Sequence, residues 1–168
     1  MRRGHTIENY FERIDKIKTS DRKISLTTDI IIGFPNESEV DFQDSLKMVD
    51  YCQFDSCYIF KYSPRIGTPA YQFEDNVSVE EKEQRFIKLE ERQRLNQHRI
   101  FKSYLNKTVQ VLVEKKSSQN NFDLSGRTSC HKVVQFKGSA ALLGKIVDIE
   151  ITESKSNTLY GKVLNTFV

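Results

Sequence analysis

The stretch KTVQVLVE, residues 107–114, alternates polar and apolar side chains with a period of two. That alternation predicts a β-strand with one buried face. Strand-like runs follow at short intervals, over residues 122–128, 132–136, 145–151 and 159–164, with Ser-, Asn- and Gly-containing turns between them. Five short strands in a segment this small predict an all-β antiparallel barrel of the oligonucleotide-binding (OB-like) kind. We therefore place a β-barrel domain at residues 104–168.

The part of the chain before this barrel alternates helical and strand patterns. Residues 7–19 carry an apolar stripe and predict a helix, and residues 24–32 end in the β-branched run of a buried parallel strand. A second helix is expected after the N-cap Ser38, and a second strand over residues 54–62. This order is typical of a parallel α/β fold. Because two strands make no stable sheet of that kind, we interpret residues 1–103 as the last portion of a larger α/β domain.

A long polar helix ends this first part. Ser78 and Glu81 have capping-box spacing, and no Gly or Pro interrupts the sequence from there to about residue 104. The apolar face is narrow, so we predict a largely solvated helix that links the α/β part to the barrel.

Charge is distributed unevenly between the two parts. Residues 1–104 contain 17 Lys/Arg against 18 Asp/Glu, whereas residues 105–168 contain 9 against 5. The basic excess of the second part indicates an anionic partner such as nucleic acid, although ordinary surface charge for solubility also accounts for it.

The cysteines and the apolar runs exclude several classes of protein. Cys52, Cys57 and Cys130 form an odd set without Cys-x-x-Cys spacing, so neither a disulfide framework nor a zinc knuckle is indicated. No apolar run has the length of a membrane helix, and no signal-peptide pattern follows the first residues. We predict a cytoplasmic protein that has no membrane partner.

Three groups of segments then identify a family. They are RRGHT (2–6); TDIIIGFP (28–35) with YSPRIGTPA (62–70); and LSGRT (124–128) with KVVQFKG (132–138) and GKIVDIEIT (144–152). In this order the set resembles the C-terminal half of the radical-SAM tRNA methylthiotransferases of the MiaB type. The resemblance implies a fragment of a radical-SAM partial TIM-like barrel, then the long helix and a TRAM barrel that binds RNA.

The resemblance also implies a chemistry. The family uses S-adenosylmethionine (SAM) and two [4Fe–4S] clusters, and this branch adds a methylthio group at C2 of N6-isopentenyladenosine 37 in tRNA. A tRNA anticodon stem-loop is then the expected partner, and a monomer is expected. The Cys-x-x-x-Cys-x-x-Cys motif that holds the SAM-cleaving cluster is absent. We therefore expect that the N-terminal half of the enzyme is missing, that this chain holds no metal ligand, and that it is inactive alone.

Site residues follow from the same resemblance, and no catalytic residue is assigned. Ligands of α/β barrels gather at the C-terminal ends of the strands, so the expected SAM and substrate cleft includes Asp29, Gly33, Arg65 and Gly67. Simple turns, a backbone cap at Asp29 and an ion pair of Arg65 are the structural alternatives. The expected RNA-binding residues are Arg127, Lys132, Lys137, Lys145, Lys115 and Lys116. Phe122 and Phe136 either stack on bases or fill the core.

Two other functions stay open at this point. The chain is alternatively a non-catalytic RNA-binding module, which the absence of a cysteine triad in the complete reading frame would indicate. Close relatives in the enzyme class act on threonylcarbamoyladenosine or on a ribosomal protein. The basic barrel with its SGRT and VVxF segments favours the isopentenyladenosine branch.

Overall fold

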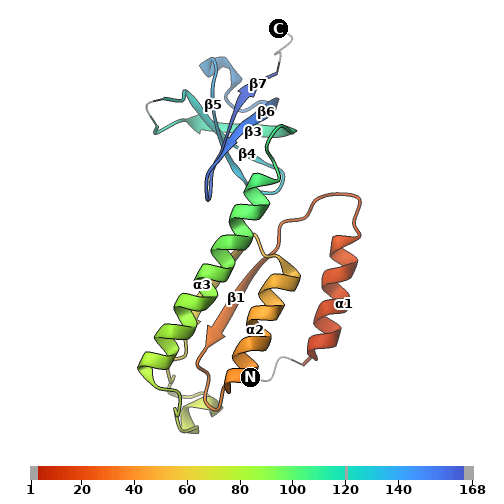
Figure 1. Cartoon of the computed structure of the whole chain (residues 1–168). Helices are drawn as coiled ribbons and strands as arrows, with labels where there is room; N and C mark the ends of the chain where they lie inside the picture. Colours follow the sequence, from red (N-terminus) through yellow and green to blue (C-terminus); the bar gives the residue numbers. More distant parts are fainter. Residues whose placement is uncertain (1–3, 120, 165–168) are drawn as a thin grey trace. The chain divides into compact units, whose positions relative to one another are not determined.

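The structure, a computed structural model, describes residues 4–119 and 121–164. The chain forms two units that divide between Asn96 and Gln97, inside the longest helix (Figure 1). Each unit has its own cluster of buried apolar side chains. The domain boundary expected after residue 103 stays a prediction.

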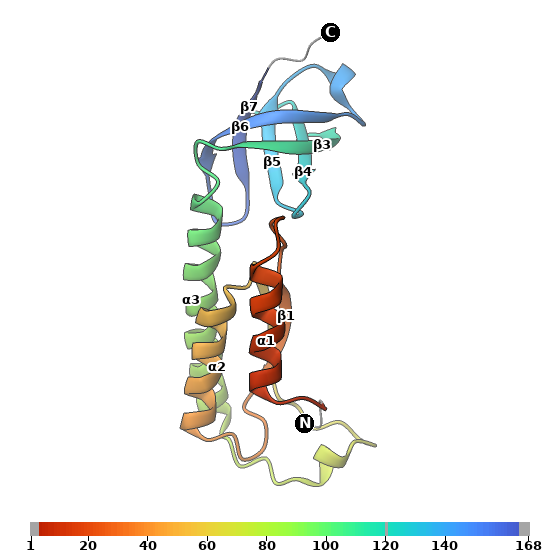
Figure 2. The same cartoon turned by 90° about the vertical axis from the view of Figure 1, so that its right-hand side faces the viewer.

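The first unit alternates helices and strands as the sequence predicts. Its elements are α1 (Ile7–Lys18), β1 (Thr27–Ile32), α2 (Glu39–Cys52), β2 (Ser56–Lys61), the short 3₁₀ helix η1 (Pro69–Gln72) and most of α3 (Val79–Lys102). β1 and β2 pair in parallel, with Thr27 opposite Ser56 and Ile32 opposite Lys61. Both views show α1 and α2 beside β1 (Figures 1 and 2). Two parallel strands agree with the α/β prediction but do not by themselves show a barrel.

Helix starts in this unit follow from local capping. Ser38 Oγ accepts a hydrogen bond from the Asp41 backbone N–H at 3.2 Å, and the Asp41 carboxylate accepts one from the Ser38 backbone N–H at 2.9 Å. This reciprocal pair is the capping box expected at α2. Ser78 Oγ accepts a hydrogen bond from the Glu81 backbone N–H at 3.1 Å, just before α3.

The two faces of the small sheet differ. Ile30 and Ile32 are buried in a cluster with Phe42 of α2 and Leu89 of α3. Alternate residues on the other face, including Asp29 and Tyr58, are exposed. The helices therefore cover one side of the sheet only within the described residues.

The second unit is a closed barrel of the strands described there. They are β3 (Thr108–Lys116), β4 (Leu124–Thr128), β5 (Val133–Lys137), β6 (Ile146–Ser154) and β7 (Leu159–Val163), and they close in the order β3-β4-β5-β7-β6 (Figure 1). All five predicted strands are present. The strands pair antiparallel as predicted, with one exception among the described pairings, because β5 and β7 pair in parallel. An odd number of strands cannot alternate direction at every pairing of a closed ring, so one pairing must be parallel.

The barrel core is apolar, and at two glycines the paired strands lie too close together for a side chain. Phe136, Val111 and Ile149 are fully buried in it, so Phe136 fills the core. A Cβ atom added at Gly126 would lie 2.3 Å from the Leu112 carbonyl oxygen, and one at Gly161 would lie 2.4 Å from the Glu150 carbonyl oxygen. Both contacts are with backbone of a paired strand, which cannot move aside independently.

We predict that Gly126→Ala destabilises the barrel more than Gly144→Ala. The first change forces a Cβ into backbone and is expected to cost roughly 3 kcal/mol of unfolding free energy. The second adds a Cβ in open space at a positive φ of 77°, which costs about 1 kcal/mol. Urea denaturation followed by circular dichroism measures both. Equal losses would contradict the steric argument.

Candidate functional site

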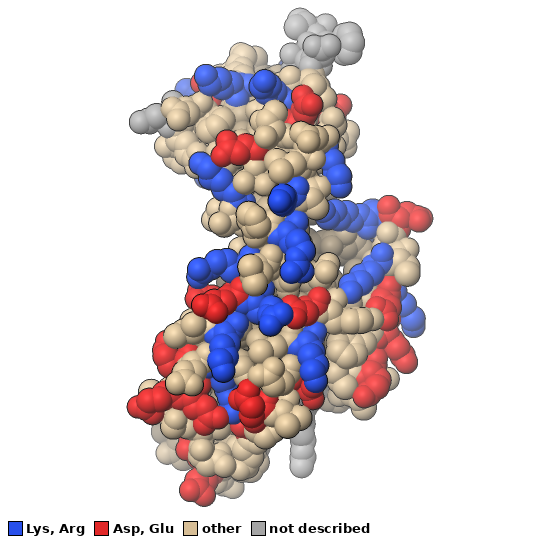
Figure 3. All heavy atoms as spheres, in the orientation of Figure 1, with Lys and Arg blue, Asp and Glu red and all other residues tan. Residues whose placement is uncertain are grey.

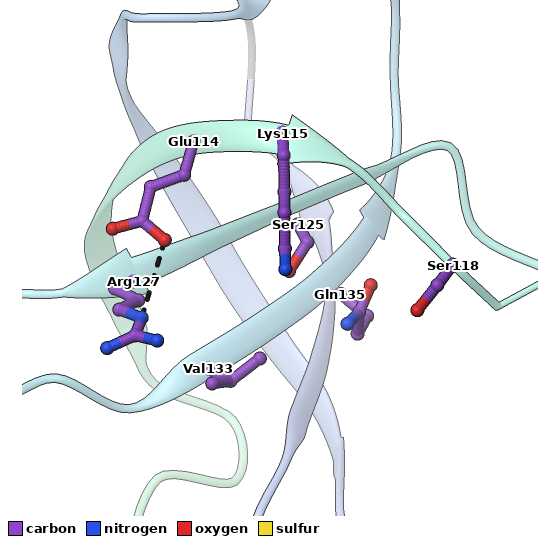
Figure 4. A pocket seen from close by; sticks show the side chains of 7 residues that line it. All are labelled: Glu114, Lys115, Ser118, Ser125, Arg127, Val133 and Gln135. Carbon is purple, nitrogen blue, oxygen red and sulfur yellow. Dashed lines mark ion pairs between the residues drawn. The ribbon is translucent and has the colours of Figure 1, made fainter.

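A polar cavity lies over three strands of the barrel. It encloses about 100 Å³ and is lined by Glu114, Lys115, Ser118, Ser125, Arg127, Val133 and Gln135 (Figure 4). These residues come from the end of β3, the loop after it, and the paired strands β4 and β5. In OB-type barrels the corresponding second and third strands and the loop between the first two are the usual nucleic-acid-binding face.

Strand register assembles the cavity from residues distant in sequence. Lys115 lies opposite Ser125, Ser125 opposite Gln135, and Arg127 opposite Val133. The β3–β4 register shifts between Val113 and Lys115. Such a bulge lets two neighbouring residues share one side of a strand pair, which explains why both Glu114 and Lys115 line the cavity.

The cavity edge carries an ion pair that water can reach. Arg127 Nε lies 3.3 Å from Glu114 Oε2, and their side chains are 48% and 40% exposed (Figure 4). An exposed pair of this kind contributes little to stability, because solvent screens it. The Arg127 guanidinium can therefore exchange its partner for a phosphate at small cost.

The predicted RNA-binding residues do not form one group. Arg127 and Lys115 line the cavity, whereas Lys116, Lys137 and Lys145 are exposed on the barrel outside its lining. On the face drawn in Figure 3, basic side chains lie among acidic ones over both units. Net charge alone thus does not locate an interface, and the cavity is the more specific feature.

Lys132 departs from its expected place at the surface. It is 5% exposed, its Nζ donates to the Cys130 carbonyl oxygen at 3.3 Å, and this ammonium lies 5.7 Å from the centre of the Phe101 ring. Its backbone N–H also donates to Thr128 Oγ1. The turn between β4 and β5 folds this side chain inward, so Lys132 is not among the accessible cations.

Sequence reasoning missed four polar residues of the cavity. They are Glu114, Ser118, Ser125 and Gln135. A signal existed for Gln135, a polar residue inside the apolar run of β5, but its neighbours depend on strand register. Phe122 is half-buried and its ring centre lies 4.9 Å from that of Tyr160.

In the first unit, the loop after β1 is fastened to α3 by a buried ion pair. Glu37 Oε2 accepts hydrogen bonds from the Gly33 backbone N–H at 2.7 Å and from Arg85 Nη1 at 2.5 Å. Arg85 Nη2 donates to Glu81 Oε1, and the Arg85 side chain is only 3% exposed. This network fixes the path of the chain at the C-terminal end of β1.

Gly33 contacts α3 closely. Its φ is 65°, and a Cβ there would lie 2.4 Å from Lys82 Cγ. Lys82 Nζ in turn donates to both carboxylate oxygens of Asp75 at 2.6 Å. The glycine is thus required by the backbone turn and by Lys82 packing.

The other predicted cleft residues are exposed. Asp29 lies on β1, opposite Tyr58. Arg65 and Gly67 lie in a turn in which Thr68 Oγ1 donates to the Arg65 carbonyl oxygen at 2.8 Å. Arg65 is exposed and forms no ion pair with another described residue.

The described residues do not fit an iron–sulfur cluster. No three His, Cys, Asp or Glu side chains among them form a group that could hold a metal ion. Burial raises the pKa of the Cys52 thiol to about 11 and that of the Cys57 thiol to about 12, and Cys57 Sγ donates to Gln93 Oε1 at 3.1 Å. Both thiols stay protonated near neutral pH, whereas cluster ligation needs thiolates. Among residues 4–119 and 121–164, no helix combines the length and the apolar character that crossing a membrane requires.

The closed five-stranded order β3-β4-β5-β7-β6 places this unit in the class of OB-like barrels. Residues 102–164 match the family model of the TRAM domain, so the chain contains a TRAM domain.

Similarity to known proteins extends beyond the barrel. The chain is 40% identical over 164 residues to the tRNA-2-methylthio-N(6)-dimethylallyladenosine synthase of Alkalilimnicola ehrlichii. The aligned region covers 98% of this chain and 37% of that protein. The chain is 43% identical over 164 residues to the synthase of Alkaliphilus oremlandii, covering 98% and 35%. It is 42% identical over its whole length to that of Oceanobacillus iheyensis, of which it covers 32%. The resemblance to tRNA methylthiotransferases is thereby confirmed, and the chain spans about a third of the length of these curated relatives.

We predict that Arg85→Met destabilises the first unit by about 3–5 kcal/mol, because it leaves the buried Glu37 carboxylate without its cation. Arg92→Met is the matched control on the same helix. It removes a half-exposed pair with Asp50 and should cost less than about 1 kcal/mol. Urea denaturation of the whole chain gives both values. Similar losses for the two variants would show that the Glu37–Arg85 pair does not fasten the loop.

Proposed function

We propose that this chain serves a tRNA methylthiotransferase that adds a methylthio group at C2 of N6-isopentenyladenosine 37. The observation that carries this proposal is the 40–43% identity, over nearly the whole chain, to proteins named for that reaction. The TRAM domain supports an RNA substrate. In this proposal the barrel binds the anticodon stem-loop and the first unit contributes to the SAM and substrate cleft.

RNA binding by the barrel is supported by its accessible cations. Lys115 and Arg127 stand at a cavity, and Lys116, Lys137 and Lys145 add positive charge on the same small domain. Cations of this kind contact phosphates and position RNA without reading its sequence. The proposed role of the barrel is therefore to hold the stem-loop while another part of the enzyme acts on the base.

The proposed role of the first unit rests on its uncovered sheet face. Asp29 and the aromatic side chains of Tyr58 and Phe60 are exposed on the face opposite the helices. In a partial TIM-like barrel, β1 and β2 would be two of several strands, this face would line the barrel interior, and the loops after the C-terminal ends of β1 and β2 would face the ligand. Asp29, Arg65 and Gly67 are then candidates to contact SAM or substrate, and Gly33 shapes the loop beside them. Bound SAM, cleaved by one electron from an iron–sulfur cluster that other residues would hold, would supply the adenosyl radical that abstracts the hydrogen from C2. Because the described residues do not fit the cluster, we assign them binding and positioning roles only.

The test is a salt-titrated binding measurement with the whole chain. The probes are an anticodon stem-loop RNA containing N6-isopentenyladenosine at position 37 and the same RNA with unmodified adenosine. We expect affinity to fall as salt rises, with a logarithmic slope of about 0.7–0.9 for each phosphate contacted, and the modified RNA to bind at least as tightly. Absence of binding at low salt would overturn the assigned role of the barrel.

A charge-matched pair of variants tests where RNA binds. Glu114→Gln removes the carboxylate that holds Arg127 and should strengthen RNA binding several-fold, roughly the value of one exposed ion pair. Glu150→Gln makes the same change of net charge on exposed β6, outside the cavity lining. It should have a smaller effect. Equal gains would indicate that only net charge matters and would exclude the Arg127 face as the interface.

A further inference from the structure

Gln135 has a buried amide oxygen without a hydrogen-bond donor. The residue is 7% exposed and lines the cavity between β4 and β5. Its Oε1 is shielded from solvent and has no partner among the described residues. An orphaned buried acceptor of this kind costs about 1–3 kcal/mol, so its presence in a folded protein calls for an explanation.

Residues on the strands at either side of β5 hold Gln135 in place. Strand register places Gln135 between Ser125 of β4 and Tyr160 of β7. Tyr160 in turn packs against the Phe122 ring. Because Phe136 beside it in sequence points into the core, Gln135 is held on the opposite, cavity side of β5. Its position is thus fixed by three strands.

Whereas Gln135 Oε1 is a hydrogen-bond acceptor, the rim of the cavity carries hydrogen-bond donors. Lys115 and Arg127 offer cationic donors, and Ser118 adds a hydroxyl (Figure 4). The cavity is smaller than the roughly 300–1,000 Å³ of a small-molecule pocket. The cavity has room for the edge of one ring of a larger ligand whose remainder stays outside. An anionic group of that ligand would lie near the cations at the rim.

A nucleobase of single-stranded RNA meets these requirements. Its edge presents an N–H donor next to an acceptor, which complements the oxygen and the NH₂ group of a Gln side chain. The attached phosphate would reach the cations at the rim. Because Oε1 is shielded from solvent in the free protein, the Gln135 amide must turn toward the cavity, and a base edge then supplies the donor that Oε1 lacks.

We propose that this cavity receives the edge of one unpaired RNA nucleobase and that Gln135 reads that edge, with the adjoining phosphate on Lys115 or Arg127. The inference rests on the proposed RNA binding and adds to it a residue that contacts a base. It predicts that Gln135 improves binding at the expense of stability in the free protein.

Gln135→Met tests this proposal, with Gln110→Met as the matched control. Gln110 lies exposed on β3 in the same barrel and does not line the cavity. The probe is a fluorescent six-nucleotide oligo(A) RNA at low salt, and melting temperature is measured for each variant. We expect Gln135→Met to bind roughly 5- to 100-fold more weakly, the discrimination that a bidentate amide–base pair provides. Its melting temperature should equal or exceed that of the parent chain, since the orphaned acceptor is gone.

An abasic six-nucleotide RNA separates base contacts from phosphate contacts. The parent chain should lose affinity when the bases are removed, and Gln135→Met should lose less, because the two changes remove the same contact. Equal losses, or unchanged oligo(A) binding by Gln135→Met, would overturn the assignment and leave a bound water as the partner of Gln135. If the parent chain binds neither the oligomers nor the stem-loop, the proposed RNA binding itself fails.

Discussion

Closure of an odd-stranded barrel is the constraint on which the second unit depends. With the described strands closed in the order β3-β4-β5-β7-β6, one pairing must be parallel, and β5 with β7 is that pairing. β5 therefore pairs antiparallel with β4 on one side and parallel with β7 on the other. The same arrangement aligns Ser125, Gln135 and Tyr160 in one row across three strands. The cavity floor is therefore a consequence of how the barrel closes.

Small local departures from regular pairing then give this floor its chemistry. The shift in β3 register between Val113 and Lys115 brings an acid and a base to the same cavity. Gly126 allows β4 to approach the Leu112 carbonyl oxygen too closely for any side chain. The close approach at Gly126 and the neighbouring bulge both occur in the β3–β4 pair. This one strand pair therefore shapes both the core and the cavity.

Local patterns predicted the elements well, and tertiary pairing accounts for what they missed. Alternation in residues 107–114 predicted β3, and the Ser38 box predicted the start of α2, because both signals lie within a few residues. The parallel pairing, the burial of Lys132 and the exposure of Asp29 depend on strands brought together from afar, which spacing cannot show. For the site, sequence reasoning found the cations Lys115 and Arg127, since charge is visible in a sequence. It missed Gln135, whose neighbours only the register supplies.

Each unit contains an Arg–Glu ion pair, and the two pairs have different roles. In the first, Arg85 and Glu37 are almost completely buried, and separating them would leave charge in a poorly solvated place, so the pair fastens the loop after β1. In the second, Arg127 and Glu114 are about half exposed, and water replaces either partner at little cost. Burial, and not the identity of the residues, decides which arginine holds the fold and which can turn to a phosphate. The exposed pair is the one that lines the polar cavity of the barrel, where a ligand anion can replace Glu114 as the partner of Arg127.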